Sequence, residues 1–103
     1  MPSYFIGIDG GGSKTRLICI DRDGNTVAEA KVAGTYYRQD GVDAVIERLR
    51  QGMDELYHAA GIKGIAAEEV IVGFGMPGYG ENKKSDDAAV KAIQRAVHPL
   101  RII

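Results

Sequence analysis

The sequence has little cysteine, little charge imbalance and no long hydrophobic run, and each shortage excludes a class of protein. One cysteine among 103 residues cannot build a disulfide scaffold, and Cys19 inside an apolar run favours a reducing, cytoplasmic location. Thirteen basic residues balance 14 acidic ones without the basic stripe of a nucleic-acid surface. No apolar run approaches the ~20 residues of a membrane helix, and we see no signal peptide. The sequence predicts one globular domain at most, with neither nucleic acid nor membrane as a partner.

Glycine is the residue that is present in excess. Fourteen of the 103 residues are glycine, which is about twice the usual share. Eight of the fourteen lie in two short clusters, Gly7–Gly12 and Gly73–Gly80. Because glycine lets the backbone turn tightly or approach another group closely, both clusters are candidate functional sites.

Hydrophobic periodicity predicts an α/β domain. Strand-like runs over 4–9, 15–21 and 26–33 precede a helix-like run over 42–60, a strand over 69–74, a second helix over 85–97 and a fifth strand from 100. Isoleucine on both faces of the second run suggests a strand that is covered on both sides. The order β-β-β-α-β-α-β therefore predicts a mixed sheet with helices on both faces.

Local signals predict where the two helices begin and end. Asp40 and Ser85 are expected as N-caps, and Gly61 is expected to stop the first helix. Gly52 inside that helix indicates close packing on the sheet. The sequence His98-Pro99 predicts the end of the second helix.

The first glycine cluster combines the groups that a nucleotide triphosphate needs. The segment Asp9–Thr15 reads D-G-G-G-S-K-T between two predicted strands. Consecutive backbone N–H groups of a glycine nest bind phosphate, and Asp9 can hold a hydrated Mg²⁺. Ser13 and Thr15 offer hydroxyls, and Lys14 offers a positive charge. The Walker pattern does not fit, since Ser13 follows the last glycine and a strand replaces the helix. The alternative is a glycine-rich β-hairpin with a surface lysine.

The run G-I-D-G-G-G-S-K-T, followed by a strand and a D-x-D-G-N turn, resembles the first phosphate motif of the actin-like ATPase and sugar-kinase superfamily. Within it, the whole chain is similar to the BadF/BadG/BcrA/BcrD-type ATPase family, which includes N-acetylglucosamine kinases. The resemblance implies a ribonuclease-H-like fold, with two such domains around a cleft that holds ATP and Mg²⁺. It implies that residues 1–103 are an incomplete N-terminal subdomain, which the remainder of the same polypeptide completes.

The resemblance also implies roles for particular residues. Asp9 would hold the metal through water, and the phosphates would be bound by Gly10, Gly11, Gly12, Ser13, Lys14 and Thr15. The reaction would transfer the γ-phosphoryl group of ATP to the hydroxyl of a sugar, with an amino-sugar-like acceptor. The family's catalytic base follows the fifth strand, beyond Ile103, so residues 1–103 alone are expected to be inactive.

Two other functions stay open on the sequence. One is an ATPase activator of a dehydratase or reductase in the same family, whose cluster cysteines would lie downstream. The other is a non-catalytic binding module that keeps a phosphate site without the chemistry. The expected partners are a nucleotide, a small sugar and the rest of the polypeptide, and a homodimer is one assembly that the resemblance allows.

The second glycine cluster has three interpretations. The run from Gly73 to Gly78 matches G-x-G-x-x-G, but a dinucleotide site needs a helix at the third glycine and an acid about 20 residues on. An ordinary strand-to-helix loop is the second interpretation. The resemblance implies a loop on the acceptor side of the cleft, with Gly75, Met76, Pro77 and Gly78 as candidates. It adds Thr35 and Tyr36 as candidates, and Tyr36 stands where related kinases often have an asparagine. The paired tyrosines that begin at Tyr36 could equally be packing residues.

Overall fold

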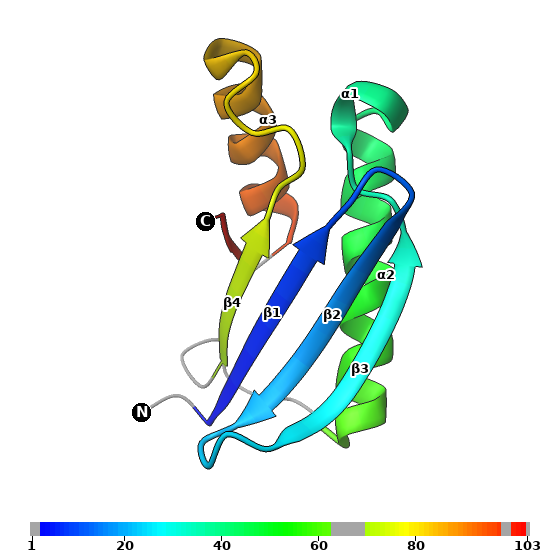
Figure 1. Cartoon of the computed structure of the whole chain (residues 1–103), viewed down its shortest axis with the longest axis vertical. Helices are drawn as coiled ribbons and strands as arrows, with labels where there is room; N and C mark the ends of the chain where they lie inside the picture. The colour runs from blue at the N-terminus through cyan, green and yellow to red at the C-terminus, as the bar shows by residue number, and fades with distance from the viewer. Residues whose placement is uncertain (1–2, 63–69, 98–99, 103) are drawn as a thin grey trace.

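The computed structural model describes residues 3–62, 70–97 and 100–102, and its order of elements is the predicted one with a single short helix added (Figure 1). The elements are β1 (Tyr4–Gly10), β2 (Lys14–Asp21), β3 (Thr26–Ala33), α1 (Tyr37–Asp40), α2 (Val42–Ala60), β4 (Val70–Gly75), α3 (Lys83–Ala96) and β5 (Leu100–Ile102). The bounds of β3 and α2 agree with the prediction. The expected stop at His98-Pro99 lies outside the described residues.

The strands form one mixed sheet in the order β3-β2-β1-β4-β5. The first three strands form an antiparallel meander, and β4 and β5 continue the sheet in parallel with β1. The mixed α/β class predicted from the sequence is therefore confirmed. The register places Asp9 on β1 opposite Arg16 of β2 on one side and Gly75 of β4 on the other.

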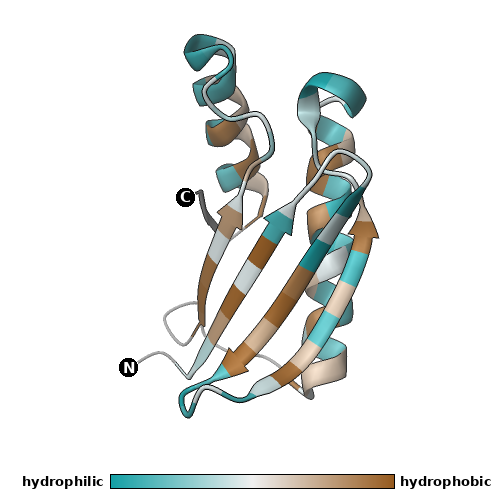
Figure 2. Ribbon diagram, in the orientation of Figure 1, coloured by the Kyte–Doolittle hydropathy of each residue, from teal (hydrophilic) through white to brown (hydrophobic). Residues whose placement is uncertain are grey.

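Both long helices lie on the same face of the sheet, behind it in Figure 1. Many of the strand residues that point toward them are buried, and the alternate colouring along β1 and β3 in Figure 2 reflects their two unlike faces. The buried residues include Ile6, Ile8, Leu17, Cys19, Val72 and Phe74. The prediction of helices on both faces does not hold for the described residues. The connections β3-α2-β4 and β4-α3-β5 run in the same direction across the sheet, and the usual right-handed crossover then puts both helices on one side.

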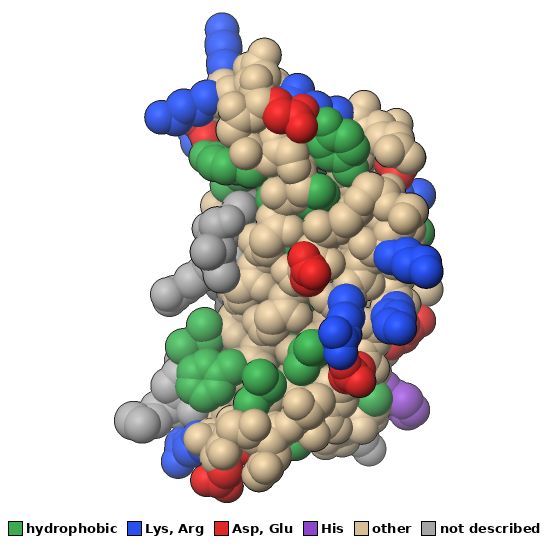
Figure 3. Space-filling model, in the orientation of Figure 1, with side chains coloured by type: hydrophobic (Ala, Val, Ile, Leu, Met, Phe, Trp, Pro, Cys, Tyr) green, Lys and Arg blue, Asp and Glu red, His purple; other side chains and the backbone are tan. Residues whose placement is uncertain are grey.

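The opposite face of the sheet carries no helix within the described residues, and it is the face seen in Figure 3. Phe5 and Ile71 are 40% and 38% exposed there, while Ile18 and Ile20 are half-buried. Strand β2 is thus apolar on both faces, as its isoleucines indicated. One of these faces is only partly covered.

The helix ends correct two of the predicted caps. Asp40 is not an N-cap, because it belongs to α1 and pairs with Arg48 at 2.6 Å, while Gly41 precedes α2. Helix α3 begins two residues before Ser85, and its N-cap is Asn82, whose side chain accepts a hydrogen bond from the Ser85 amide at 3.3 Å. Asparagine is as good a cap as serine, so the choice between them depends on the loop that precedes the helix.

The two glycines of α2 behave as predicted. Gly61 ends the helix in the left-handed conformation, with φ 71°, which glycine adopts without a steric penalty. A methyl group on Gly52 would lie 2.9 Å from a terminal carbon of Leu17 on β2. The helix therefore approaches the sheet more closely at Gly52 than a larger residue would allow.

Two further features bear on the predictions about cellular location and membrane partners. Cys19 is a free, buried thiol, and the cytoplasmic location inferred from it stays a prediction. Across residues 3–62, 70–97 and 100–102, none of the helices has the length and hydrophobicity that crossing a membrane requires.

Candidate functional site

Three segments that the sequence singled out separately meet at the carboxyl ends of β1 and β4. They are the hairpin between β1 and β2, the connection from β3 to α1, and the loop from β4 to α3. A methyl group on Gly10 would lie 2.6 Å from Oγ1 of Thr35 and 2.7 Å from the carbonyl oxygen of Gly75. The carboxyl ends of strands are where open α/β sheets bind ligands, so the sequence-predicted residues form one candidate site.

The hairpin is held by close backbone packing against the connection that follows β3. The amide of Thr35 donates to the carbonyl of Gly11 at 2.9 Å. A methyl group on Gly34 would lie 2.1 Å from the carbonyl oxygen of Gly12, far inside van der Waals contact. The sequence analysis missed Gly34, whose only signal is a glycine directly after a predicted strand.

Gly10 and Gly11 of the hairpin meet a requirement for space rather than for a left-handed backbone. Among the residues that the structure describes, positive φ angles occur at five other glycines and at none of Gly10, Gly11 and Gly12. A methyl group on Gly11 would lie 2.7 Å from the carbonyl oxygen of Lys14, whereas one on Gly12 would meet nothing within 4 Å. The left-handed conformation that helps to shape an anion nest is therefore absent from this hairpin.

A buried pair of hydroxyls joins the same two segments. Oγ1 of Thr15 and Oγ1 of Thr35 are 3.0 Å apart, and both side chains are 0% exposed. Sequence reasoning placed Thr15 beside the phosphates and Thr35 beside the acceptor. The structure brings the two hydroxyls together beneath the hairpin, where they bind each other. Arg48 of α2 adds to this support by donating to the carbonyl of Gly34 at 2.8 Å.

The polar side chains at the surface of the hairpin are available for a ligand. Asp9, Ser13 and Lys14 are exposed, and the described part of the chain gives none of them a side-chain hydrogen bond or an ion pair. A carboxylate and an ammonium left unpaired beside a fixed hairpin suit a phosphate chain and its hydrated cation.

Asp9 also lines a hollow of about 480 Å³ on the open face of the sheet. The hollow is bordered by Gly7, Ile8, Asp9, Arg16, Ile18, Ile20, Gly73 and Gly75. In the described residues, no three acidic, histidine or cysteine side chains come together as a metal cage. A single carboxylate fits a cation that keeps most of its water, as Mg²⁺ does.

The predicted acceptor residues divide into a buried part and a surface part. Met76 is 6% exposed and belongs to the hydrophobic core. Gly78 has φ 75° and lies against the ring of Tyr36, since a methyl group on it would be 2.5 Å from Cε1 of that ring. The hydroxyl of Tyr36 donates to Oε2 of Glu81 at 2.8 Å, and this hydrogen bond raises the pKa of the tyrosine. Pro77 is half-buried between these positions.

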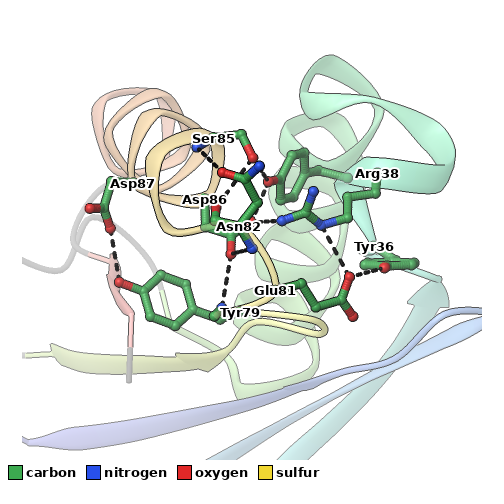
Figure 4. A network of polar contacts seen from close by, with 10 residues as sticks. Tyr36, Arg38, Tyr79, Glu81, Asn82, Ser85, Asp86 and Asp87 are labelled. Atoms are coloured by element: carbon green, nitrogen blue, oxygen red, sulfur yellow. Dashed lines mark hydrogen bonds and ion pairs between the residues drawn. The ribbon is translucent and has the colours of Figure 1, made fainter.

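Sequence reasoning missed the centre of a polar network that joins α1 to the start of α3 (Figure 4). Asp86 is 0% exposed, and its carboxylate pairs with Arg38 and accepts from the hydroxyl of Tyr37. Burial by itself raises the pKa of Asp86, but the hydrogen bond from Tyr37, two backbone amides and the charge of Arg38 outweigh it and lower the pKa. An acid in the first turn of a helix looks in sequence like an ordinary dipole partner, so its burial was not evident.

The loop geometry bears on the dinucleotide alternative. That interpretation requires the helix to open at the third glycine of the motif. Helix α3 begins at Lys83, five residues after Gly78, and so the backbone needed for pyrophosphate binding is not formed there.

Comparisons with known proteins bear on the family and the fold of the chain. The sequence profile of the BadF/BadG/BcrA/BcrD ATPase family matches residues 6–100. A solved structure from Chromobacterium violaceum, provisionally described as an N-acetylglucosamine kinase, superimposes with a TM-score of 0.75 at 21% identity, over 98% of this chain and 34% of that one. An exopolyphosphatase from Cytophaga hutchinsonii superimposes with a TM-score of 0.50 at 14% identity, over 97% and 34%. The chain thus spans about a third of the length of the solved structures that it matches.

Proposed function

The chain belongs to the BadF/BadG/BcrA/BcrD ATPase family, and from this we propose that it supplies the phosphate-binding part of an ATP-dependent sugar kinase. In the reaction, a sugar hydroxyl would attack the γ-phosphorus of ATP, and ADP would leave. The observation that carries the proposal is the packed hairpin between β1 and β2, which presents unpaired Asp9 and Lys14 at the carboxyl end of β1.

Each group of the hairpin has a proposed task. The backbone from Gly10 to Gly12 and the hydroxyl of Ser13 would donate to the β- and γ-phosphates, and Lys14 would offset their negative charge. Thr15 would support the hairpin without contacting the phosphates, because its buried hydroxyl binds the hydroxyl of Thr35. Asp9 would hold Mg²⁺ through water, and the cation would screen the charge that develops on the transferring group.

A rigid site matters in phosphoryl transfer because positioning and electrostatic stabilisation do most of the catalytic work. The steric fit of Gly10, Gly11 and Gly34 fixes the hairpin before any ligand arrives. The acceptor would lie toward Tyr36 and Gly78, which border the same strand ends. The structural neighbour described as an N-acetylglucosamine kinase supports an amino-sugar-like acceptor as the first one to test.

Titration of the isotope-labelled chain with Mg·ATP tests the phosphate site directly. We expect chemical-shift changes concentrated in the amides of 10–15. Lys14→Ala should weaken the apparent affinity about tenfold, because it removes one charge-assisted contact of about 1.4 kcal/mol. Asp9→Asn should abolish the difference between ATP with and without Mg²⁺.

Lys91→Ala is the matched control, because this exposed lysine lies on α3, away from the hairpin. It should bind Mg·ATP as the unmodified chain does. Hairpin amides that stay silent at millimolar Mg·ATP, or equal losses in Lys14→Ala and Lys91→Ala, would contradict the proposed function.

A further inference from the structure

Asp86 is a buried carboxylate whose hydrogen bonds all lead to the acceptor side of the site. Its Oδ2 accepts from the amides of Gly80 at 2.8 Å and Asn82 at 3.2 Å. Its Oδ1 accepts from Tyr37 and Arg38 (Figure 4). Two of these donors come from the loop between β4 and α3, and two come from α1. One side chain therefore joins the two segments that carry the predicted acceptor residues.

Contacts that do not involve Asp86 also hold these segments, since the ring of Tyr37 packs against the hydrophobic core and its hydroxyl lies 3.2 Å from Oγ of Ser85. Helix α1 nevertheless has only four residues, none of them fully buried, and its Asp40 forms an ion pair with Arg48 of α2. In the loop, Gly78 and Gly80 have φ 75° and 102°, and the loop's own backbone bonds are long, at 3.4 Å to Met76 and 3.2 Å to Gly78. Glycine-rich backbone loses much entropy on ordering, so the charge-assisted bonds to Asp86 are needed to hold the loop in one conformation.

The connection before α1 and the β4–α3 loop meet where Tyr36 contacts Gly78, and we call this contact the edge. The ring of Tyr36 lies directly against the α-carbon of Gly78, with no room for a side chain. Glu81 closes the same edge, because its Oε2 accepts from Tyr36 at 2.8 Å and pairs with Nε of Arg38 at 3.3 Å. Arg38 thus binds Glu81 and Asp86 together, so a change at Asp86 should be felt at Tyr36.

We propose that Asp86 is a positioning residue that holds α1 and the β4–α3 loop in one arrangement and so sets the separation of Tyr36 and Gly78. This inference rests on the proposed function, since an acceptor bound at this edge gives the separation its importance. The coupling between Asp86 and the edge can nevertheless be measured without any ligand. The four donors favour the ionised form of Asp86, in agreement with its lowered pKa.

The test reads the ring current of Tyr36 at the α-protons of Gly78 by NMR. In the unmodified chain these protons should be displaced from the usual glycine range, and the displacement should vanish in Tyr36→Leu. In Asp86→Asn the displacement should fall by more than half, because the new amide N–H₂ group faces donors. A loss of stability alone would not change this signal in the folded molecules.

Asp87→Asn is the matched control, because within the described residues the neighbouring carboxylate binds the hydroxyl of Tyr79 alone, at 2.9 Å. It should keep the full displacement. Tyr37→Phe and Arg38→Gln each remove one donor to Asp86 and leave the other three, so they provide the measurement if Asp86→Asn does not fold. Tyr37→Phe also removes the contact with Ser85, and Arg38→Gln also removes the ion pair with Glu81, so the two variants are interpreted together. Each should reduce the displacement in part.

Retention of the full displacement in folded Asp86→Asn, or in both single-donor variants, would overturn the positioning role. The Mg·ATP titration is a separate readout on the hairpin. Hairpin shifts with Mg·ATP together with an unchanged Gly78 signal in Asp86→Asn would sink the positioning role and leave the proposed function standing. Loss of the Gly78 displacement in Asp86→Asn, together with hairpin amides that do not shift with Mg·ATP, would support the positioning role and contradict the proposed function.

Discussion

The hairpin after β1 and the loop after β4 lie side by side, yet different forces hold them. The hairpin is fixed by missing side chains, since Gly10, Gly11 and Gly34 bring backbone against backbone, and by one neutral pair of hydroxyls. The loop is fixed by charge, through Asp86, Arg38 and Glu81. Steric fit is insensitive to pH and salt, whereas a carboxylate network is sensitive to pH. The phosphate side of the site should therefore stay rigid under conditions that release the acceptor side.

The largest effect should come from filling the space at Gly34. Gly34→Ala places a methyl group 2.1 Å from the carbonyl oxygen of Gly12, and overpacking of this kind costs about 3 kcal/mol. Urea denaturation should show this loss, and Mg·ATP should no longer shift the hairpin amides.

Gly12→Ala is the control for this prediction, since a methyl group there meets nothing within 4 Å and the φ angle is not positive. Its free energy of unfolding should change by about 0.5 kcal/mol or less. Equal losses in the two variants would show that the hairpin needs glycine for another reason than space.

A smaller effect should follow removal of one buried hydroxyl. Thr35→Val keeps the shape of the side chain but leaves Oγ1 of Thr15 buried without its partner, which costs about 2 kcal/mol. The double variant Thr15→Val/Thr35→Val should recover part of that loss, because neither hydroxyl is then left unpaired. The free energies of unfolding of the two single variants and the double variant measure this coupling, and strict additivity would argue against the hydroxyl pair.

Acid should disrupt the β4–α3 loop before the hairpin, without any mutation. The pKa of Asp86 lies below the ordinary value of 3.8, so its contribution to stability is fully present above that ordinary value. It is lost as the pH falls through the lower pKa of the folded state. In a titration from pH 5 downward, the ring-current displacement of Gly78 should disappear at a higher pH than the native shifts of Gly11 and Gly12. Simultaneous loss would mean that one cooperative transition governs both regions.

The smallest effect should come from the rim of the network. Tyr79→Phe removes the hydroxyl that donates to Asp87 at 2.9 Å, but Tyr79 is 48% exposed and water can replace it. The urea midpoint and the Gly78 signal should both stay unchanged. A clear shift in either would extend the network beyond Asp86.

Much of the fold followed from local patterns. The strand over 26–33 and the helix over 42–60 have the bounds that periodicity indicated, because each packs one continuous apolar face against the core, partly buried in the strand and buried in the helix. The helix caps were harder to place. Asp40 is the last residue of the short helix α1 and Asn82 ends the loop before α3, and at such places one residue more or less decides which side chain reaches the free amides. The side of the sheet on which the helices lie depends on the direction of the chain crossovers, which periodicity does not contain.

The sequence by itself determined the order of the main elements and the presence of a glycine-rich hairpin, because both depend on consecutive residues: for the hairpin, an apolar strand, an acid, three glycines and a lysine. Only the tertiary structure decided why the glycines are needed, and it alone revealed Gly34 and Asp86. Their roles depend on contacts with residues more than 20 and 40 positions away, namely Gly12 with Gly34 and Arg38 with Asp86. Such contacts exist only after β3, α2 and β4 have brought the strand ends together.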